Sequence, residues 1–201
     1  MTEPRVYIVD DDEAMRDSLK WLLESRGLKV ELYPSGEAFL RAFDSEFCGC
    51  LVLDVRMPGM SGMDLYTRLQ ARASTLPVIF ITGHGDVPMA VSALKKGAAD
   101  FIEKPFNNRD MVRLIESCLK QDRAAAARRA EKASLAQYLE SLTQRESEVL
   151  NLIVAGKLNK QIADELSISI KTVEVHRSRV MEKMGANSVA ELVQLVLKSR
   201  A

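Results

Sequence analysis

Four short apolar runs decide the fold, and in the sequence they read RVYIV (residues 5–9), CLVLD (50–54), PVIFIT (77–82) and ADFIE (99–103). Runs of this length, rich in β-branched and aromatic residues, are typical of buried strands. A polar residue ends or follows each run, in chain order Asp10, Asp54, Thr82 and Lys104. Because the carboxyl ends of parallel strands line one crevice, these side chains are expected to meet there.

Strand and helix patterns alternate along the first 122 residues. The expected strands are Val6–Val9, Leu28–Leu32, Leu51–Leu53, Pro77–Ile81 and Ala99–Ile102. The stretches between them carry apolar residues at helical spacing, and the last two helices are expected at Val87–Lys96 and Asp110–Leu119. Five such units predict an α/β doubly wound, five-stranded parallel sheet.

The remaining sequence has a helical pattern. Residues 123–138 are rich in alanine and charge, without Pro or Gly, and predict a helical linker that either continues the preceding helix or acts as a spacer. It could transmit a signal or merely join two domains. Residues 139–201 predict a second, all-α domain of four helices, with N-terminal caps expected at Thr143, Asn159, Ser169 and Ser188.

Composition separates the two halves. The net charge of the 201 residues is zero, but residues 1–122 hold 15 basic and 19 acidic side chains and residues 123–201 hold 13 and 9. A charge of −4 followed by +4 suggests a cation-binding half and a polyanion-binding half. Three cysteines without metal-ligand spacing indicate free thiols, and with no secretory or membrane-spanning segment the protein is expected to be cytoplasmic.

The crevice residues suit one kind of chemistry. Asp10, Asp11 and Asp54 would repel one another when partly buried, and Mg²⁺ accepts carboxylate oxygens as ligands. Asp54 can also attack a phosphorus atom. Lys104 can neutralise phosphoryl oxygens and Thr82 can donate a hydrogen bond to them. The set predicts a magnesium-dependent phosphoryl acceptor.

The first half resembles the receiver domain of two-component response regulators over about residues 4–122. The motifs are VDDD (9–12), LDVRMPGMSG (53–62), ITGHGD (81–86) and EKPF (103–106). The resemblance implies Asp54 as phospho-acceptor and Mg²⁺ held by Asp10, Asp11, Asp54 and the backbone carbonyl of Arg56, with Asp12 a solvated neighbour. It implies phosphoryl-binding and switch roles for Thr82, Phe101, Lys104 and Pro105, and a cis Lys104–Pro105 bond.

Two assignments within this half stay open between alternatives. Phe101 is either a switch aromatic that turns inward when Thr82 moves or a plain core residue. Arg56 and His84 either flank the water that hydrolyses the acyl phosphate or belong to a solvated loop.

The second half resembles LuxR/NarL-type DNA-binding domains over about residues 139–198, through NKQIA (159–163), TVEVH (172–176) and KMG (183–185). The implied helix-turn-helix places its second helix in the major groove. Base edges would be faced by Glu174, Val175 and Ser178. Phosphates would lie near Lys160, Lys171, Thr172, His176, Arg177 and Lys183. His176 is open between a phosphate contact and a packed helix residue, and the last helix is implied to carry a dimer contact.

The whole chain, GHGDVPMAV (83–91) included, resembles the FixJ subgroup. This implies a transcription regulator and not an enzyme, with a receiver (1–122), a linker (123–138) and a DNA-binding domain (139–201). The implied partners are a sensor histidine kinase, double-stranded DNA, RNA polymerase and, after phosphorylation, a second copy of the chain. Rival interpretations are an aspartyl-phosphate phosphatase, an RNA-binding antiterminator and a constitutive DNA binder with a vestigial receiver.

Overall fold

The computed structural model describes residues 3–44, 46–83 and 87–200, with the chain divided into two compact units, Met1–Ala126 and Ala127–Ala201. The division falls inside one continuous helix, α5 (Asn108–Glu140). The expected linker, residues 123–138, is therefore part of a helix that begins before it and ends after it. No helix in the described ranges is both long and apolar enough to cross a membrane.

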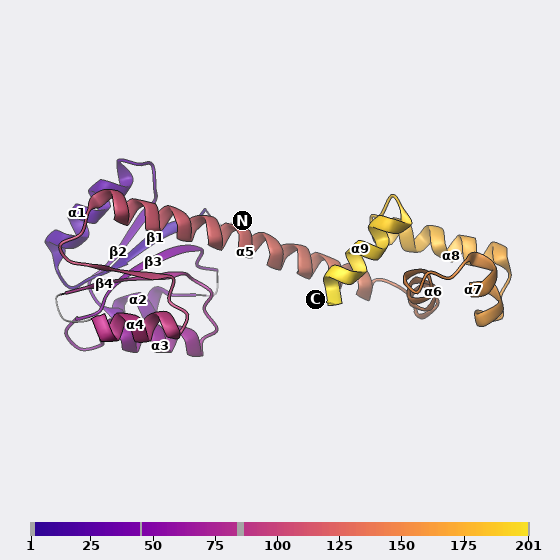
Figure 1. The fold of residues 1–201 in the computed structure, drawn as a ribbon, viewed down its shortest axis with the longest axis horizontal. Helices are drawn as coiled ribbons and strands as arrows, with labels where there is room; N and C mark the ends of the chain where they lie inside the picture. The colour runs from indigo at the N-terminus through magenta and orange to yellow at the C-terminus, as the bar shows by residue number, and fades with distance from the viewer. Residues whose placement is uncertain (1–2, 45, 84–86, 201) are drawn as a thin grey trace. The chain divides into compact units, whose positions relative to one another are not determined.

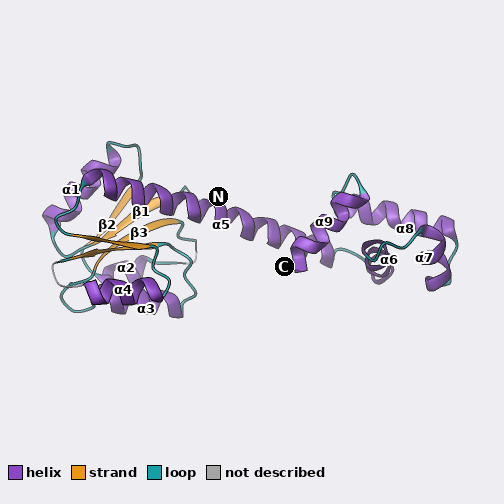
Figure 2. Ribbon diagram, in the orientation of Figure 1, coloured by secondary structure: helices purple, strands orange, loops and turns teal. Residues whose placement is uncertain are grey.

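A parallel sheet forms the middle of the first unit (Figure 2). Its strands are β1 (Arg5–Val9), β2 (Val30–Tyr33), β3 (Gly49–Asp54), β4 (Val78–Thr82) and β5 (Asp100–Glu103). Their order is β2-β1-β3-β4-β5, and every pair is parallel. The doubly wound sheet predicted from the sequence is confirmed. β3 and β4 are buried along their whole length, as their unbroken apolar runs require.

Helices cover both faces of this sheet (Figure 1). In addition to α5 they are α1 (Glu13–Glu24), α2 (Gly36–Ala42), α3 (Gly62–Ala71) and α4 (Val87–Lys95). α1 and α5 pack on one face in a core that contains Leu23 and Ile115. α2, α3 and α4 pack on the other, around Phe39, Leu65 and Ala93. β1 and β3 are neighbours whose following helices go to opposite faces, which opens a crevice at their carboxyl ends.

Local signals set several helix ends. The Ser35 side chain accepts from the Ala38 amide at 3.2 Å, as expected for the cap of α2. The Asp12 side chain accepts from the Ala14 and Met15 amides at 2.9 and 3.3 Å, so Asp12 caps α1 and is more than a solvated neighbour. β2 starts later than predicted because the Leu28 amide still bonds to a carbonyl of α1.

One buried contact ties α5 to the sheet. The Asp122 carboxylate accepts from the Gly49 amide at 2.8 Å, and the Asp122 side chain is only 3% exposed. Gly49 has a positive φ, and a Cβ there would lie 1.8 Å from the Arg5 carbonyl oxygen. β3 is therefore held at its first residue by the helix and carries Asp54 at its last. Cys118, one turn before Asp122, is buried, and none of the three cysteines, Cys48, Cys50 and Cys118, forms a disulfide, as predicted.

The second unit is all-helical, as predicted. Besides the end of α5 it contains α6 (Gln144–Val154), α7 (Asn159–Leu166), α8 (Ile170–Lys183) and α9 (Val189–Arg200). Their shared core includes Val149, Ile162, Val173 and Leu192. Leu135 of α5 is 4% exposed and belongs to the same core. The end of α5, which is part of the expected linker, therefore contributes to the core of the second unit.

The caps expected at Thr143, Ser169 and Ser188 form, whereas the one expected at Asn159 does not. Thr143 and Glu146 form the full capping box of α6. Asn159 does not cap α7. Leu158 takes the cap position, and its amide donates to Gln161 Oε1 at 2.8 Å. At α9 the Ser188 hydroxyl accepts from the Glu191 amide, while the Glu191 carboxylate accepts from the amide of Asn187.

We predict that Leu135→Ala destabilises the second unit by about 2–5 kcal/mol, because it leaves a cavity in a small core. Hydrogen exchange followed by mass spectrometry on the full chain should show faster exchange in peptides from α6, α8 and α9, with peptides from β1, β3 and β4 unchanged. Leu197→Ala is the matched control, because Leu197 is 55% exposed on α9. Equal exchange in the two variants would contradict a role for α5 in this core.

Candidate functional site

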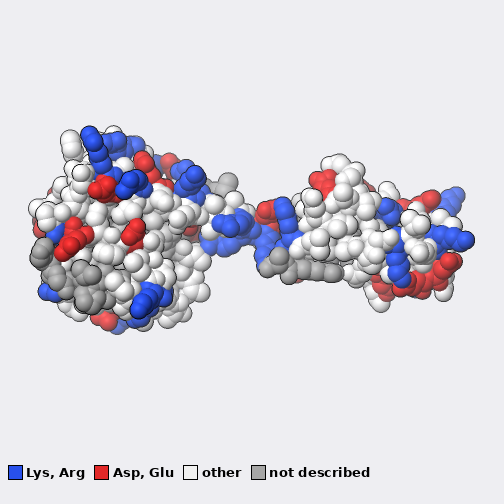
Figure 3. Space-filling model, viewed as in Figure 1, with Lys and Arg blue, Asp and Glu red and all other residues white. Residues whose placement is uncertain are grey.

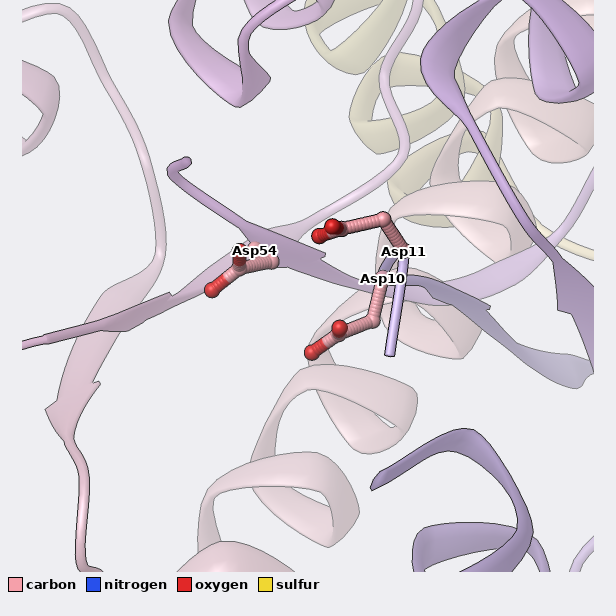
Figure 4. Close-up of side chains that lie close together, drawn as sticks. All are labelled: Asp10, Asp11 and Asp54. Carbon is pink, nitrogen blue, oxygen red and sulfur yellow. The ribbon is translucent and has the colours of Figure 1, made fainter. Parts of the chain in front are cut away.

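Three carboxylates meet where β1 and β3 end. Asp10 and Asp11 directly follow β1, and Asp54 is the last residue of β3, the strand paired with β1. One oxygen from each carboxylate lies within 4.8 Å of the others. Figure 4 shows the three side chains next to one another. The structure thus brings together the three aspartates that the sequence predicted as metal ligands.

Burial differs among the three. Asp10 is 1% exposed and Asp54 is 6% exposed, whereas Asp11 is exposed. The Asp12 amide donates to Asp10 Oδ1 at 2.8 Å, and Arg16 Nη1 donates to the Asp10 carbonyl oxygen at the same distance. These bonds fix the Asp10 backbone and one of its oxygens. The pocket therefore has two positioned carboxylates and a third that faces solvent.

Lys104 closes the pocket from the other side. Its Nζ lies 3.1 Å from Asp10 Oδ2 and 3.1 Å from Asp54 Oδ1. The Lys104 amide donates to the Thr82 carbonyl oxygen at 2.8 Å, so the residue continues the pairing of β4 with β5. The Lys104–Pro105 bond is cis, which confirms that prediction.

The electrostatics of the pocket are set by these few groups. Burial raises the pKa of Asp54; Lys104 opposes this shift, and the charges of Asp10 and Asp11 add to it. Burial acts to lower the pKa of Lys104, but Asp10 and Asp54 outweigh it, and that pKa is raised. The anionic form of Asp54 is therefore held at a cost, and a hard cation between the carboxylates would reduce that cost.

Thr82 and Phe101 lie on one face of the sheet. Thr82 ends β4 and is 1% exposed. Phe101 pairs with Phe80 across β4 and β5, and Thr82 pairs with Glu103 two residues further along. Because side chains two residues apart in a strand share a face, Thr82 and Phe101 point to the side that α4 covers. Phe101 is half-buried and packs against the core there.

The loop after β3 depends on a glycine that the sequence reading did not single out. A Cβ on Gly62 would lie 2.2 Å from the Asp54 carbonyl oxygen. The Gly62 amide donates to the Val55 carbonyl oxygen at 3.0 Å. The second Gly of MPGMSG was the available signal. Arg56 is exposed in this loop, and His84 lies outside the described residues.

In the second unit α7 and α8 form the helix pair predicted to bind DNA. The Ser169 hydroxyl accepts from the Thr172 amide at 3.0 Å and caps α8, while Val173 and Val180 bury its inner face. The exposed predicted DNA contacts are Lys160, Lys171, Thr172, Glu174, Val175 and Ser178. Figure 3 shows basic side chains gathered over this part of the unit, with acidic ones beside them.

Three predicted phosphate contacts are partly withdrawn from solvent. Arg177 is half-buried, and its Nη1 donates to Asn159 Oδ1 at 3.1 Å. Among the described residues, the buried Nδ1 atom of His176 has no hydrogen-bond partner, so one edge of this ring faces the protein. Lys183 Nζ bonds to Glu146 Oε2 at 2.7 Å and to the Ser141 carbonyl oxygen at 2.9 Å. Lys183 is thus engaged within the unit.

Comparisons with known proteins agree with this geometry. Residues 6–116 match the response regulator receiver domain, and residues 140–196 match the bacterial regulatory proteins of the luxR family. The chain therefore belongs to the response regulators that join a receiver to a LuxR-type DNA-binding domain, and it is a transcriptional regulator of a two-component system. Receiver domains bind Mg²⁺ at an acidic pocket of the kind formed here.

Individual relatives span nearly the whole chain. The transcriptional regulatory protein FixJ of Bradyrhizobium diazoefficiens is 46% identical over 98% of this chain and 97% of its own. The C4-dicarboxylate transport transcriptional regulatory protein DctR of Rhodobacter capsulatus is 48% identical over 94% and 98%. Among solved structures, the response regulator StyR is 45% identical over 98% and 100%, with a TM-score of 0.92. The relatives support the predicted FixJ-like subgroup.

We predict that Asp54→Asn raises the stability of the first unit at pH 7 when divalent cations are absent. The pKa of Asp54 is raised in the folded state, so its contribution is most favourable at low pH and is lost as pH rises through that pKa. Asparagine is neutral at every pH considered, so the variant does not lose stability as pH rises through the pKa of Asp54. The urea midpoint, followed by fluorescence of Trp21, the single tryptophan, should therefore be higher for the variant at pH 7.

The difference between variant and wild type should shrink as pH falls toward 3.8, the ordinary pKa of an aspartate. Added Mg²⁺ should stabilise the wild type more than the variant. Asp17→Asn, a change of an exposed aspartate on α1, serves as the control and should leave the midpoint nearly unchanged. A lower midpoint for Asp54→Asn at pH 7 would contradict the assigned electrostatics.

Proposed function

We propose that this response regulator accepts a phosphoryl group on Asp54 from a sensor histidine kinase, and that phosphorylation promotes dimerisation and DNA binding. The observation that carries the proposal is the placement of Asp54 within reach of both Lys104 and the other two carboxylates. A cation would offset the repulsion among these carboxylates, and the cation and Lys104 together would offset the negative charge of a phosphoryl group added to Asp54.

Mg²⁺ fits the donor set of this pocket. Asp10, Asp11 and Asp54 offer hard carboxylate oxygens, and the backbone carbonyl of Arg56 would complete the protein ligands. When bound, the ion supplies positive charge that offsets the charge on the phosphoryl oxygens. Asp10 is already oriented by its bond from the Asp12 amide, so little reorganisation is needed to hold a cation.

The chain's own groups account for the transfer. An Asp54 carboxylate oxygen forms a bond to phosphorus while the bond from phosphorus to the donor histidine nitrogen breaks, and that nitrogen keeps the electron pair. Lys104, which now bridges Asp10 and Asp54, would move its ammonium group to a phosphoryl oxygen. The Thr82 hydroxyl would donate to another phosphoryl oxygen.

The response would pass from Thr82 to Phe101 and to the adjoining surface. Both residues lie on the face covered by α4, and Phe101 is half-buried there, so an inward turn of its ring would change the surface beside α4. Among its described side chains, α4 exposes the apolar residues Met89, Val91 and Leu94. Apolar groups exposed together on one helix favour burial against a partner, and we assign this surface, with β5 and the first part of α5, to homodimerisation.

The second unit would bind the DNA major groove through α8. Glu174, Val175 and Ser178 are exposed on it and would face base edges, while Lys160, Lys171 and Thr172 would contact phosphates. His176 and Arg177 would lie at the edge of the phosphate contacts. The ammonium group of Lys183 is already paired with Glu146. RNA polymerase would be the partner that contacts the DNA-bound dimer.

We predict that Asp54→Asn abolishes labelling of the full chain by radioactive acetyl phosphate in the presence of Mg²⁺, because an amide cannot form the acyl phosphate. Phosphate-affinity gels would provide a second measurement. Asp17→Asn is again the matched control and should label like wild type. Full, acid-stable and base-labile labelling of Asp54→Asn would exclude Asp54 as the acceptor.

We also predict different effects for two substitutions on α8. Lys171→Ala should weaken binding to all duplexes and reduce the slope of log affinity against log salt by about 1, because one phosphate contact is lost. Glu174→Ala should change the preferred sequence recovered from a random DNA pool, because a base contact is lost. A change of preference without a change of slope for Lys171→Ala would exclude its phosphate role.

A further inference from the structure

A partly buried ion pair holds the carboxyl end of α8. Lys183 Nζ lies 2.7 Å from Glu146 Oε2 and 2.9 Å from the Ser141 carbonyl oxygen. The Glu146 side chain is 3% exposed and that of Lys183 is 34% exposed. Glu146 is in the first turn of α6, and Ser141 follows the last residue of α5. One side chain therefore joins the end of α8 to the junction of α5 and α6.

Glu146 is fully engaged in this arrangement. Its Oε2 also accepts from the Thr143 amide at 2.9 Å, and the Thr143 hydroxyl accepts from the Glu146 amide at 3.3 Å. The hydrogen bond from Lys183, together with the capping contacts at Thr143, lowers the pKa of Glu146 to about 2. The carboxylate is therefore ionised at neutral pH, and Lys183 is its counter-charge. Removing Lys183 would leave the buried Glu146 carboxylate without its counter-charge.

Lys183 is also distant from the exposed contact residues of α8. Lys171 stands in the first turn, and Glu174 and Val175 follow within one turn of it. Lys183 is the last residue of the helix, so at about 1.5 Å per residue its backbone lies roughly 18 Å from that of Lys171. Lys183, the basic residue at the carboxyl end of α8, is thus the one that pairs with a group inside the unit.

Apolar packing alone would leave the position of α8 loosely defined. Its buried residues Val173 and Val180 contact a core of aliphatic side chains, and such contacts are not directional. Hydrogen bonds and ion pairs require one geometry. Arg177 bonds to Asn159 of α7, and Lys183 bonds to Glu146 of α6. These two contacts fix α8 against both neighbouring helices.

We propose that Lys183 is a positioning residue of the DNA-binding unit, which sets the angle of α8 through Glu146 and does not act by contacting a DNA phosphate. The proposal rests on the DNA-binding function described above and assigns a part in it to Glu146, whose side chain is only 3% exposed. Loss of either partner frees the carboxyl end of α8, and the base-reading residues then lose their fixed placement.

The test is a double-mutant cycle in the full-length protein, treated with acetyl phosphate, on a duplex selected from a random-sequence DNA pool. The variants are Glu146→Gln, Lys183→Met and the double substitution. Glutamine keeps an oxygen for the Thr143 amide and removes only the charge, and methionine keeps most of the apolar stem of lysine. We expect about tenfold weaker binding for each single variant, with no further loss in the double, because the two residues act as one unit.

A phosphate-contacting Lys183 gives the opposite pattern. Glu146→Gln would then leave affinity unchanged or raise it, since an acidic group is removed, and the two substitutions would be additive. That result would overturn the proposal. Glu148→Gln is the matched control, because Glu148 is on the same helix and forms a more exposed ion pair with Arg145. Its affinity should match wild type.

A measurement on the unaltered protein keeps the proposal testable if a variant fails to fold. Reductive methylation with formaldehyde, read by mass spectrometry, should modify Lys183 slowly with or without the duplex, while Lys171 is protected only when the duplex is bound. Rapid modification of free Lys183 together with protection by DNA would overturn the proposal. Failure of the wild type to bind any duplex would instead overturn the DNA-binding function itself.

Discussion

Repulsion between carboxylates at the ends of β1 and β3 is the constraint on which the receiver unit depends. Parallel pairing of these strands brings Asp10 and Asp54 together at one edge of the sheet, and burial raises the pKa of Asp54. Lys104 offsets part of this cost by bridging both side chains. The pocket therefore forms with part of the repulsion between its carboxylates left uncompensated. A cation between the carboxylates would lower this repulsion.

Contacts around the pocket hold Asp10 and β3 in place. Asp12 orients Asp10 with its backbone amide and caps α1 with its side chain. Gly62 permits the loop after Asp54 to pass within contact distance of the strand. At the other end of β3, the Gly49 amide is bonded to Asp122 of α5. The strand that carries Asp54 is thus held at its first residue by α5, and the backbone of its last residue packs closely against Gly62.

Much of the fold could be predicted because its signals are local. Fully apolar runs identified β1, β3 and β4, and the Thr143–Glu146 and Ser169 caps identified the starts of α6 and α8. The predicted pocket residues meet because the carboxyl ends of parallel strands lie at the same edge of the sheet. The errors arose where a local signal competed with another contact. Asparagine is a common N-cap residue, but the Asn159 side chain accepts a hydrogen bond from Arg177. The Gln161 side chain instead accepts from the Leu158 amide at the start of α7.

The sequence by itself determined the class of fold, the helix and strand types and the chemistry gathered at one edge of the sheet, because hydrophobic period, caps and strand-end residues act over a few positions. Only the tertiary structure decided which charged groups are already paired. Lys183 and Lys171 are both lysines on α8, yet Lys183 pairs with Glu146, 37 positions away, whereas Lys171 is exposed. Burial of a partner so distant in the chain depends on how the helices pack, and no local pattern encodes it.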